Sequence, residues 1–395
     1  MKIIASAVSL LASLSSCNAE ASFLRAAIST DDSPTIIDLS QDIPRDEAAI
    51  SSSPGAKAVQ EAASQDPTIH NAMVLENGSI VATYTRDDVD PSEPFGVASV
   101  TKSWMSLLFG MLVDDGLLSV DDTLGDIFPD DAAWADVTDG STDFRKGVTI
   151  EELLTYTSGL LDTLEMSGSP ESGLGGQSLQ GSLSYPLLGV KGKFAYLANS
   201  QIHSYIIKER TGMTPRQYLA ENVMSKLRIG EDEYGWGQTS DGIEWGGSGL
   251  ILTPMQMAKF GQLYLQGGRT NPSNDERLIS EKWIDASFTH HSTTDFSTYL
   301  DELDGQERLQ GLPYGYCFWG LYQHPSGSTV YCAAGAGGNY ICVDRDLDRV
   351  MILQREPQPF KEFNILDLVV DNTLSFRAPN GGLSVISSTA ESRTE

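Results

Sequence analysis

Basic residues are scarce in this 395-residue sequence, and their scarcity excludes polyanionic partners. Only 26 lysines and arginines face 54 aspartates and glutamates, which gives a formal net charge of −28. Nucleic acids and anionic membrane surfaces repel a chain with this charge. We therefore expect no nucleic-acid partner.

Histidine, cysteine and long apolar runs are also rare. The five histidines and four cysteines are scattered without the spacing of metal ligands, so we expect no metal and no cofactor. An apolar run over residues 3–14 follows a single lysine and is too short to cross a bilayer. No transmembrane segment is expected, and the sequence does not specify an oligomeric state.

The N-terminus is typical of a secretory signal peptide, which we place at residues 1–19. Small residues follow the apolar run, with Cys17 and Ala19 placed like the −3 and −1 positions of a cleavage site. This pattern predicts a secreted protein, extracellular or periplasmic. The alternative is a lipid anchor on Cys17, because "LSSC" at Leu14–Cys17 resembles a bacterial lipidation box.

Composition divides the rest of the chain into three parts. A Ser-, Asp-, Ala- and Pro-rich stretch over 20–64 predicts a mobile lead-in with one helix near 45–64. Residues 65–377 read as one folded domain with a helical insertion at roughly 115–250, and the polar residues 378–395 as a disordered tail. Because strand-like runs lie at both ends and helices between them, we expect a mixed α/β fold, with a sheet flanked by helices.

Local signals are strongest at three places. Asn77-Gly78 between two apolar runs predicts a two-residue hairpin turn. A helix is expected at about 200–211, ended by Gly212. A second is expected at about 254–266, ended by Gly267-Gly268.

Three cysteines remain if the signal peptide is removed: Cys317, Cys332 and Cys342. A bridge between Cys332 and Cys342 across adjacent strands is one possibility in an oxidising compartment. Three buried thiols are the other, and the sequence leaves both open.

The segment "VASVTKSWMSLLFGMLVDDG" at residues 97–116 places Ser99 and Lys102 three residues apart. On a helix these side chains share one face. About one such pair is expected by chance in a serine-rich chain, so the spacing alone is weak. However, a lysine in the first turn opposes the helix dipole, and the helix body is almost wholly apolar. A buried helix start of this kind would favour a nucleophilic serine beside a basic lysine.

Five collinear segments carry a resemblance to a known family: "ASVTKSW", "VTIEELLTYTSGL", "FAYLANSQIHSYIIKERTG", "WGGSGLILTPMQMAKFGQLYLQGG" and "AAGAGGNYICVDRDLDRVMIL". Together they span about residues 65–374. The chain resembles the penicillin-recognising serine hydrolases, in the branch that contains class C β-lactamases, D-aminopeptidases, carboxylesterases and 6-aminohexanoate-dimer hydrolase. The resemblance implies a β-lactamase/transpeptidase-like fold, with an antiparallel sheet beside an all-helical subdomain.

The resemblance also implies roles for individual residues. Ser99 would be the acylated nucleophile, Lys102 would help to deprotonate it, and Tyr196 would be the general acid and base. The backbone N–H groups of Ser99 and Ala336 would form the oxyanion hole. Further candidates for substrate contact are Asn199, Tyr316, Trp319 and Gly337, although aromatic residues on strands are more often core.

Two departures from the family pattern bear on the substrate. The second motif is often Tyr-x-Asn, but here position 198 is alanine and Asn199 follows it. Either Asn199 takes the role from a shifted backbone, or the amide is missing. The third motif is Gly335-Ala336-Gly337 in place of Lys-Thr-Gly, so the cation that would bind a penicillin carboxylate is absent.

These observations predict a secreted serine hydrolase that cleaves a small-molecule ester or amide through an acyl-enzyme on Ser99. A β-lactamase or D-Ala-D-Ala carboxypeptidase is the alternative within the same chemistry. A non-catalytic relative that only binds in the cleft is the alternative from another class.

Overall fold

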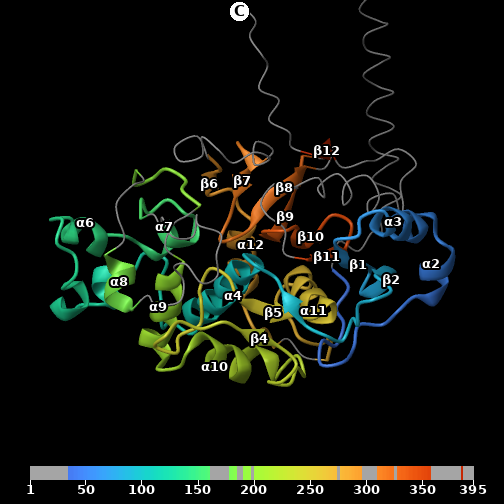
Figure 1. Ribbon diagram of the computed structural model, residues 1–395, viewed down its shortest axis with the longest axis horizontal. Coiled ribbons are helices and arrows are strands. Elements are labelled where there is room, and N and C mark those ends of the chain that lie inside the picture. The colour runs from blue at the N-terminus through green and yellow to red at the C-terminus, as the bar shows by residue number, and fades with distance from the viewer. Residues whose placement is uncertain are drawn as a thin grey trace, which may run out of the picture. The chain divides into compact units, whose positions relative to one another are not determined.

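A nine-stranded sheet and a three-stranded sheet, with helices packed on them, make up the described part of the chain (Figure 1). The computed structural model describes residues 34–160, 178–184, 190–196, 200–273, 276–295, 309–323, 327–356 and 384–385. The chain divides into two units after Thr35, and all the elements below lie in the second unit, which begins at Ile36.

The larger sheet joins the two ends of this unit. Its strands lie in the order β2 (Ser79–Thr85), β1 (Ile69–Glu76), β11 (Arg349–Arg355), β10 (Asn339–Asp344), β9 (Thr329–Gly335), β8 (Trp319–Gln323), β7 (Pro313–Tyr314) and β6 (Ser292–Thr293), and β12 (Ser384–Val385) pairs with β8. Every pairing is antiparallel. The smaller sheet consists of β3 (Phe95–Gly96), β5 (Leu250–Leu252) and β4 (Gly235–Trp236).

The hairpin between β1 and β2 turns where the sequence predicts it. Asn77 and Gly78 have φ angles of 47° and 71°, so both lie in the left-handed region that a two-residue hairpin turn of type I′ requires. Asparagine tolerates this region and glycine is unrestricted there. The predicted hairpin is confirmed.

Helices cover both faces of the larger sheet. Helices α4 (Val100–Asp114) and α11 (Pro254–Leu265) pack on strands β9–β11 and β1, and α2 (Glu47–Ser52) and α3 (Pro54–Ser64) on β1 and β2. Figure 1 shows α3 above and α11 below β1 and β11. Trp104 of α4 stacks on Phe260 of α11, with ring centroids 4.4 Å apart. Helix α12 (Glu281–Ser287) closes against α4, where the Trp283 ring occupies the space beside Gly110.

The remaining helices in the described part of the chain lie beside α4, on the side away from α2 and α3, and below it (Figure 1). They are α5 (Leu124–Ile127), η1 (Asp131–Trp134), α6 (Thr142–Lys146), α7 (Ile150–Leu154), α8 (Leu179–Leu183), α9 (Gln201–Thr211), α10 (Pro215–Leu219) and η4 (Ala220–Met224). The expected mixed α/β fold with an antiparallel sheet and a helical region is confirmed. No helix in the described part of the chain combines the length and the apolar character needed to span a membrane.

Both predicted helix ends are confirmed as well. Helix α9 ends at Gly212, whose φ is 74°, and α11 ends just before Gly267 and Gly268, at 68° and 82°. These are left-handed residues that terminate a helix at low cost because glycine has no Cβ.

The prediction of a mobile lead-in over 20–64 is wrong for its described part from Leu39 onward. Leu39 and Ile43 are buried, and the Leu39 amide donates to the carbonyl of Thr270 at 2.8 Å. The one expected helix is two, α2 and α3, because Ser53 caps the second and Pro54 occupies its first position. The buried face of α3 consists of Gly55, Ala56, Val59 and Ala63, which are small residues.

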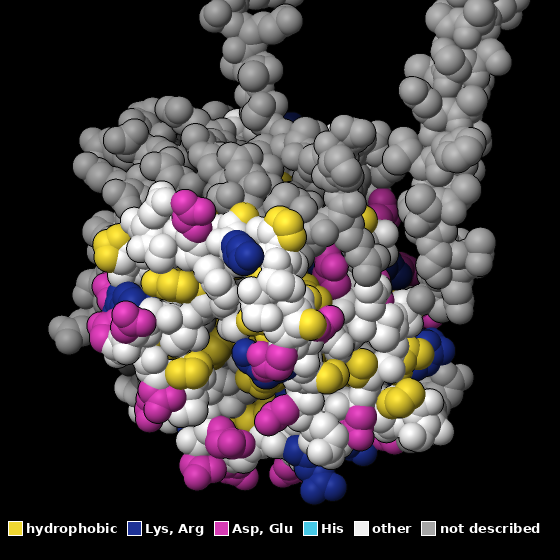
Figure 2. Space-filling view, turned by 90° about the vertical axis from the view of Figure 1, so that its right-hand side faces the viewer, with side chains coloured by type: hydrophobic (Ala, Val, Ile, Leu, Met, Phe, Trp, Pro, Cys, Tyr) yellow, Lys and Arg dark blue, Asp and Glu magenta, His cyan; other side chains and the backbone are white. Residues whose placement is uncertain are grey.

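The side of the molecule with α2 and α3 has no large apolar area in view. Figure 2 shows acidic and basic side chains interspersed with single apolar groups over this face. Isolated apolar side chains of this kind are normal on a protein surface. The predicted signal peptide at 1–19 and the predicted tail at 378–395, apart from the two residues of β12, lie outside the described residues.

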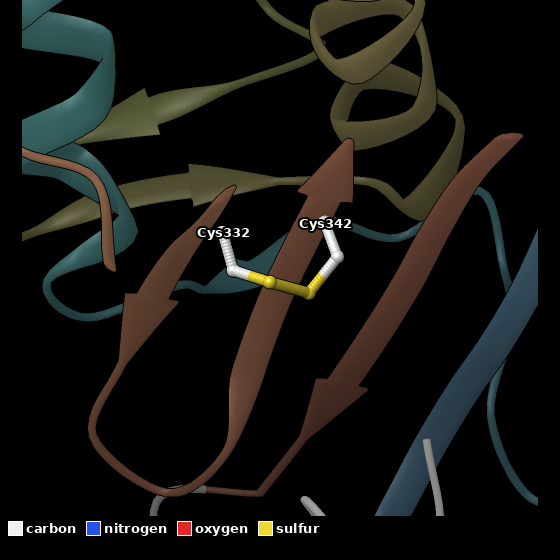
Figure 3. Close-up of a disulfide and its surroundings, with 2 residues drawn as sticks. All are labelled: Cys332 and Cys342. Atoms are coloured by element: carbon white, nitrogen blue, oxygen red, sulfur yellow. A yellow bond between two sulfur atoms is a disulfide. The ribbon is translucent and has the colours of Figure 1, made fainter. Parts of the chain in front are cut away.

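A disulfide joins two neighbouring strands of the sheet. Cys332 of β9 and Cys342 of β10 are directly paired in the antiparallel register, with Cα atoms 4.0 Å apart (Figure 3). Cys317 is free and buried. Of the two possibilities that the sequence leaves open, the structure has the bridge.

Replacing Cys332 and Cys342 together by alanine is expected to lower the free energy of unfolding by roughly 2–3 kcal/mol, because the bridge restricts the unfolded chain. Urea denaturation of the oxidised protein and of the double variant measures the difference. In the denatured, non-reduced protein, iodoacetamide should modify Cys317, as well as Cys17 where the chain retains it, and spare Cys332 and Cys342. Alkylation of Cys332 or Cys342 would contradict the bridge.

Candidate active site

Helix α4 starts beneath the strands of both sheets, and its first turn carries the predicted pair. Ser99 is the N-cap residue, but its side chain makes no capping hydrogen bond to the helix. Every residue from Val100 to Leu112 is buried. The Ser99 hydroxyl is therefore available for chemistry at the end of an otherwise enclosed helix.

Lys102 connects Ser99 to two other elements. Its side chain is buried, with 3% of the residue exposed, and Nζ donates to Ser99 Oγ at 2.9 Å and to the carbonyl oxygen of Gly247 at 2.8 Å. The same Nζ lies 5.0 Å from the centroid of the Tyr196 ring. The structure thus brings Ser99, Lys102 and Tyr196 together.

The backbone before Ser99 takes an unusual conformation. Ala98 has a φ of 49°, in the left-handed region, which costs a non-glycine residue about 1–3 kcal/mol. Such strain persists only where the surroundings fix it, and it concentrates at functional sites. The sequence gives no sign of it, because alanine has no preference for this region.

The end of β9 lies directly against the backbone of residues 97–99. A Cβ atom at Gly335 would stand 2.3 Å from the Val97 carbonyl oxygen and 3.2 Å from the Ser99 amide nitrogen. Only glycine permits this approach. It brings the next residue, Ala336, to the start of α4, as a two-donor oxyanion hole would require.

Ala336, Gly337 and Gly338 form the turn between β9 and β10. Gly337 and Gly338 have φ angles of 80° and 89°, and the Gly338 amide donates to the Gly335 carbonyl at 3.0 Å. Both predicted residues of this segment, Ala336 and Gly337, therefore lie in one short turn beside Ser99. We call residues 336–338 the oxyanion turn.

Aromatic rings enclose Tyr196 on one side of the site. The ring of Tyr156 stacks on it at 5.1 Å, and that of Trp319 lies at 4.9 Å. Phe194 and Tyr314 complete the group. Trp319, a predicted substrate contact, is therefore a neighbour of Tyr196, although only 4% of it is exposed.

Tyr316, the other predicted aromatic contact, belongs to a different group. Its ring stacks on His291 at 4.3 Å and lies 5.1 Å from Trp283, and its hydroxyl donates to Glu151 Oε1 at 2.8 Å. No ring contact in the described chain joins it to Tyr196. Tyr316 lies within the turn between β7 and β8, whereas Trp319 is the first residue of β8.

Two groups in the site have no counterpart among the predicted residues. The Gly247 carbonyl accepts from Lys102, and the loop that carries it passes so close to α9 that a Cβ at Gly246 would lie 2.1 Å from the Ser200 carbonyl oxygen. Tyr156 reaches the start of α9 from the other direction, where its hydroxyl lies 2.8 Å from Ser200 Oγ. The glycine pair in "WGGSGL" and the tyrosine in "LLTYTSGL" are the signals that could have identified them. Asn199 lies outside the described residues, so its predicted role stays a prediction.

Cys317 is excluded as the nucleophile. Burial raises the pKa of its thiol to about 12, despite the opposing charge of Lys102. Only 2% of the residue is exposed, and a reactive cysteine needs a lowered pKa and access.

His203 on α9 lies behind the site rather than in it. Burial lowers the pKa of its imidazole to about 3, and the positive charge of Lys102 adds to the effect. Neither ring nitrogen has a hydrogen-bond partner among the described residues, and the ring packs edge-on against Phe109 at 5.2 Å. The imidazole is therefore neutral in the folded protein at all ordinary pH values.

This histidine should make the fold sensitive to acid. Below about pH 6.5 the unfolded chain binds a proton that the folded protein does not, so the free energy of unfolding falls by up to ~1.4 kcal/mol per pH unit down to the folded pKa. His203→Leu removes this loss. Urea denaturation at pH 7, 6 and 5 measures the free energy of unfolding of both proteins. The value for His203→Leu minus that for the wild type should increase as the pH falls. A difference that does not change with pH would contradict a neutral His203.

The fold of this chain is similar to that of many solved structures, of which three serve as examples. EstCE1, described as a hydrolase with promiscuous acyltransferase activity, matches at 15% identity and a TM-score of 0.63, over 81% of this chain and 98% of that one. A penicillin binding protein from Bacillus halodurans matches at 17% identity and 0.58, over 79% and 98%. A candidate 6-aminohexanoate-dimer hydrolase from Bacillus anthracis matches at 16% and 0.57, over 86% and 89%.

The family is settled by the sequence profile. The profile named Beta-lactamase matches residues 61–363, which is well over half of the chain. The matched region includes Ser99, Lys102, Tyr196 and the oxyanion turn. All the residues of the candidate site named above therefore lie within it. The chain belongs to the beta-lactamase family.

Proposed function

We propose that this protein is a serine hydrolase that cleaves small neutral esters or amides through an acyl-enzyme on Ser99. The observation that carries the proposal is the 2.9 Å hydrogen bond between Lys102 Nζ and Ser99 Oγ, at the buried start of α4. A buried lysine held against a serine is how a hydroxyl is activated without a histidine. The relatives in this family that are named as hydrolases support the same chemistry.

The reaction follows from the positions of these groups. Ser99 Oγ attacks the carbonyl carbon, and its proton passes to Lys102, which accepts it as a neutral amine. The N–H groups of Ser99 and Ala336 hold the oxygen that becomes negative. Lys102 passes the proton through the Tyr196 hydroxyl to the departing alcohol or amine, which leaves an acyl group on Ser99. A water molecule then attacks this ester while its proton moves back along the same path, and Ser99 Oγ takes that proton as the acid is released.

A neutral substrate is favoured by the charge around the oxyanion turn. Gly335, Ala336 and Gly337 supply no cation. Arg355 reaches the turn from behind, where it donates to the Gly337 carbonyl at 3.4 Å, but its side chain is 2% exposed and ion-paired with Asp66. A cation that is buried and already neutralised offers little to a substrate carboxylate.

A fluorophosphonate should form one adduct with the protein, at Ser99. Intact-mass measurement is expected to show the adduct in the wild type and none in Ser99→Ala. Ser103→Ala is the matched control, because Ser103 lies on the same helix and donates instead to the Cys317 carbonyl at 2.6 Å. It should leave the adduct unchanged.

The same assay with benzylpenicillin separates the alternatives. We expect neither a stable adduct nor rapid turnover, because no cation awaits the penicillin carboxylate. Either result would favour the β-lactamase or D-Ala-D-Ala carboxypeptidase reading. Failure of both reagents to acylate or phosphonylate the wild type would favour a non-catalytic binding protein.

Tyr196→Phe removes the hydroxyl and keeps the ring stacked on Tyr156. For a p-nitroanilide, whose leaving group must be protonated, kcat/KM should fall by about 10²–10⁴. For the p-nitrophenyl ester of the same acyl group the loss should be much smaller, because p-nitrophenolate leaves without a proton. Tyr156→Phe is the control and should change both values by one common factor. If Tyr196→Phe lowered kcat/KM equally for the anilide and the ester, Tyr196 would not be the acid that protonates the leaving group.

A further inference from the structure

The oxyanion turn needs support from outside itself. Gly337 and Gly338 are two consecutive glycines with φ angles of 80° and 89°. Glycine leaves the backbone free to adopt many other conformations. The direction of the Ala336 N–H must therefore be fixed by groups that bind the turn.

Asn339, the first residue of β10, is one such group. It is 1% exposed, and its amide nitrogen donates to the Ala336 carbonyl at 3.2 Å. Its amide oxygen accepts from the backbone N–H of Arg355 at 3.1 Å. A buried amide that uses both its donor and its acceptor in this way clamps the turn to the end of β11.

The Arg355 side chain holds the next peptide. One guanidinium nitrogen donates to the Gly337 carbonyl at 3.4 Å, and the other is ion-paired with Asp66. Asp66 in turn accepts from the amide and the hydroxyl of Thr68, at 3.0 Å and 2.6 Å. The planar fork of arginine presents separate nitrogens to the two partners in a fixed geometry, whereas a lysine offers a single nitrogen.

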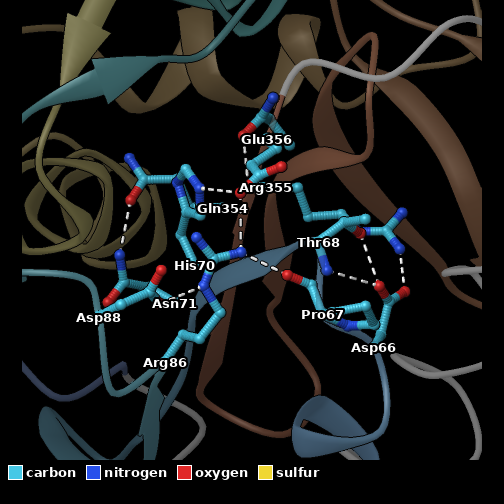
Figure 4. A network of polar contacts seen from close by, with 11 residues as sticks. Asp66, Pro67, Thr68, His70, Asn71, Arg86, Asp88, Gln354, Arg355 and Glu356 are labelled. Atoms are coloured by element: carbon cyan, nitrogen blue, oxygen red, sulfur yellow. Dashed lines mark hydrogen bonds and ion pairs between the residues drawn. The ribbon is translucent and has the colours of Figure 1, made fainter.

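Figure 4 shows the polar network that extends from Asp66 and Arg355 to His70 and Glu356. His70 lies 3.4 Å from Glu356, which follows Arg355, and its ring lies 4.2 Å from that of Phe95. Phe95 begins β3, which is followed by residues 97–99. The network therefore also contacts the strand that precedes Ser99.

We propose that Asn339 and Arg355 are positioning residues, which hold the oxyanion turn so that the Ala336 N–H faces the same oxygen as the Ser99 N–H. This inference rests on the proposed function, because it assigns the turn to the oxyanion hole. Neither residue touches substrate. Each acts through the peptide that it binds.

Kinetics of Asn339→Ala and Arg355→Lys with p-nitrophenyl butyrate test the proposal. An oxyanion contact strengthens only in the transition state, so its loss lowers kcat and spares KM. Removal of a whole donor costs about 10²–10³ in kcat. A misdirected donor should cost less, about 10- to 100-fold in Asn339→Ala, with KM within about threefold. Arg355→Lys keeps the cation for Asp66 and should lose about three- to tenfold.

The inhibition constant of a boronic acid is a second measurement, and a general loss of stability would not change it. Phenylboronic acid forms a tetrahedral adduct whose oxygen occupies the oxyanion hole, so its inhibition constant should rise by the same factor as kcat/KM falls. Asp88→Asn is the matched control. Asp88 belongs to the same network through Arg86 Nε at 2.6 Å, is exposed and has no described contact with the turn. It should leave kcat, KM and the inhibition constant unchanged.

Amide hydrogen exchange of the peptide that covers residues 333–340 tests whether Asn339 holds the oxyanion turn, independently of whether the protein is a hydrolase. Exchange there should accelerate in Asn339→Ala and not in Asp88→Asn, whether or not the protein is an enzyme. Unchanged exchange, or kcat within twofold of the wild type, overturns the positioning role. A wild type that neither cleaves the ester nor labels at Ser99 overturns the proposed function, and exchange still decides whether Asn339 holds the turn.

Discussion

The buried amino group of Lys102 makes the contacts on which the site depends. A polar group removed from water is costly unless other polar groups surround it. Ser99 Oγ, the Gly247 carbonyl and the face of the Tyr196 ring approach Nζ from α4, the loop before β5 and the segment before α9. The lysine therefore draws three separate parts of the chain to one point, and that convergence creates the site.

Glycines make this convergence possible on two sides. Gly246 lets the loop that carries the Gly247 carbonyl press against the start of α9, and Gly335 lets β9 press against the residues before Ser99. In both places a Cβ would lie about 2 Å from a backbone oxygen, a distance that no relaxation of side chains can relieve. A methyl group at either position would move one wall of the site away from Ser99. Both the packing of the fold and the geometry of the site therefore require glycine at positions 246 and 335.

The sequence predicted the parts of the fold and site that side chains encode locally. The Asn77-Gly78 turn, the ends of α9 and α11, and the shared face of Ser99 and Lys102 all follow from residue type and spacing. The Gly247 carbonyl could not be predicted, because a backbone acceptor leaves no signature in the sequence. The approach of Asn339 and Arg355 to the oxyanion turn depends on strand register, and the placement of Leu39 depends on the Thr270 carbonyl, more than 200 residues away. The position of Tyr316 could not be predicted for the same reason, because it lies in a turn whose course depends on how β7 and β8 pair.

The charges on the surface and those at the site both favour a neutral substrate. Buried charged residues include both signs, among them Lys102, Arg145, Arg349, Glu76 and Asp344, so the excess of acidic residues behind the net charge of −28 lies mainly on the surface. Such a surface repels anions over roughly a Debye length, about 8 Å at physiological ionic strength. At the site itself Arg355 is committed to Asp66 and to the oxyanion turn. An anionic substrate would therefore meet repulsion on approach and, among the described residues of the oxyanion turn, no cation to compensate its charge, whereas a neutral ester or amide meets neither obstacle.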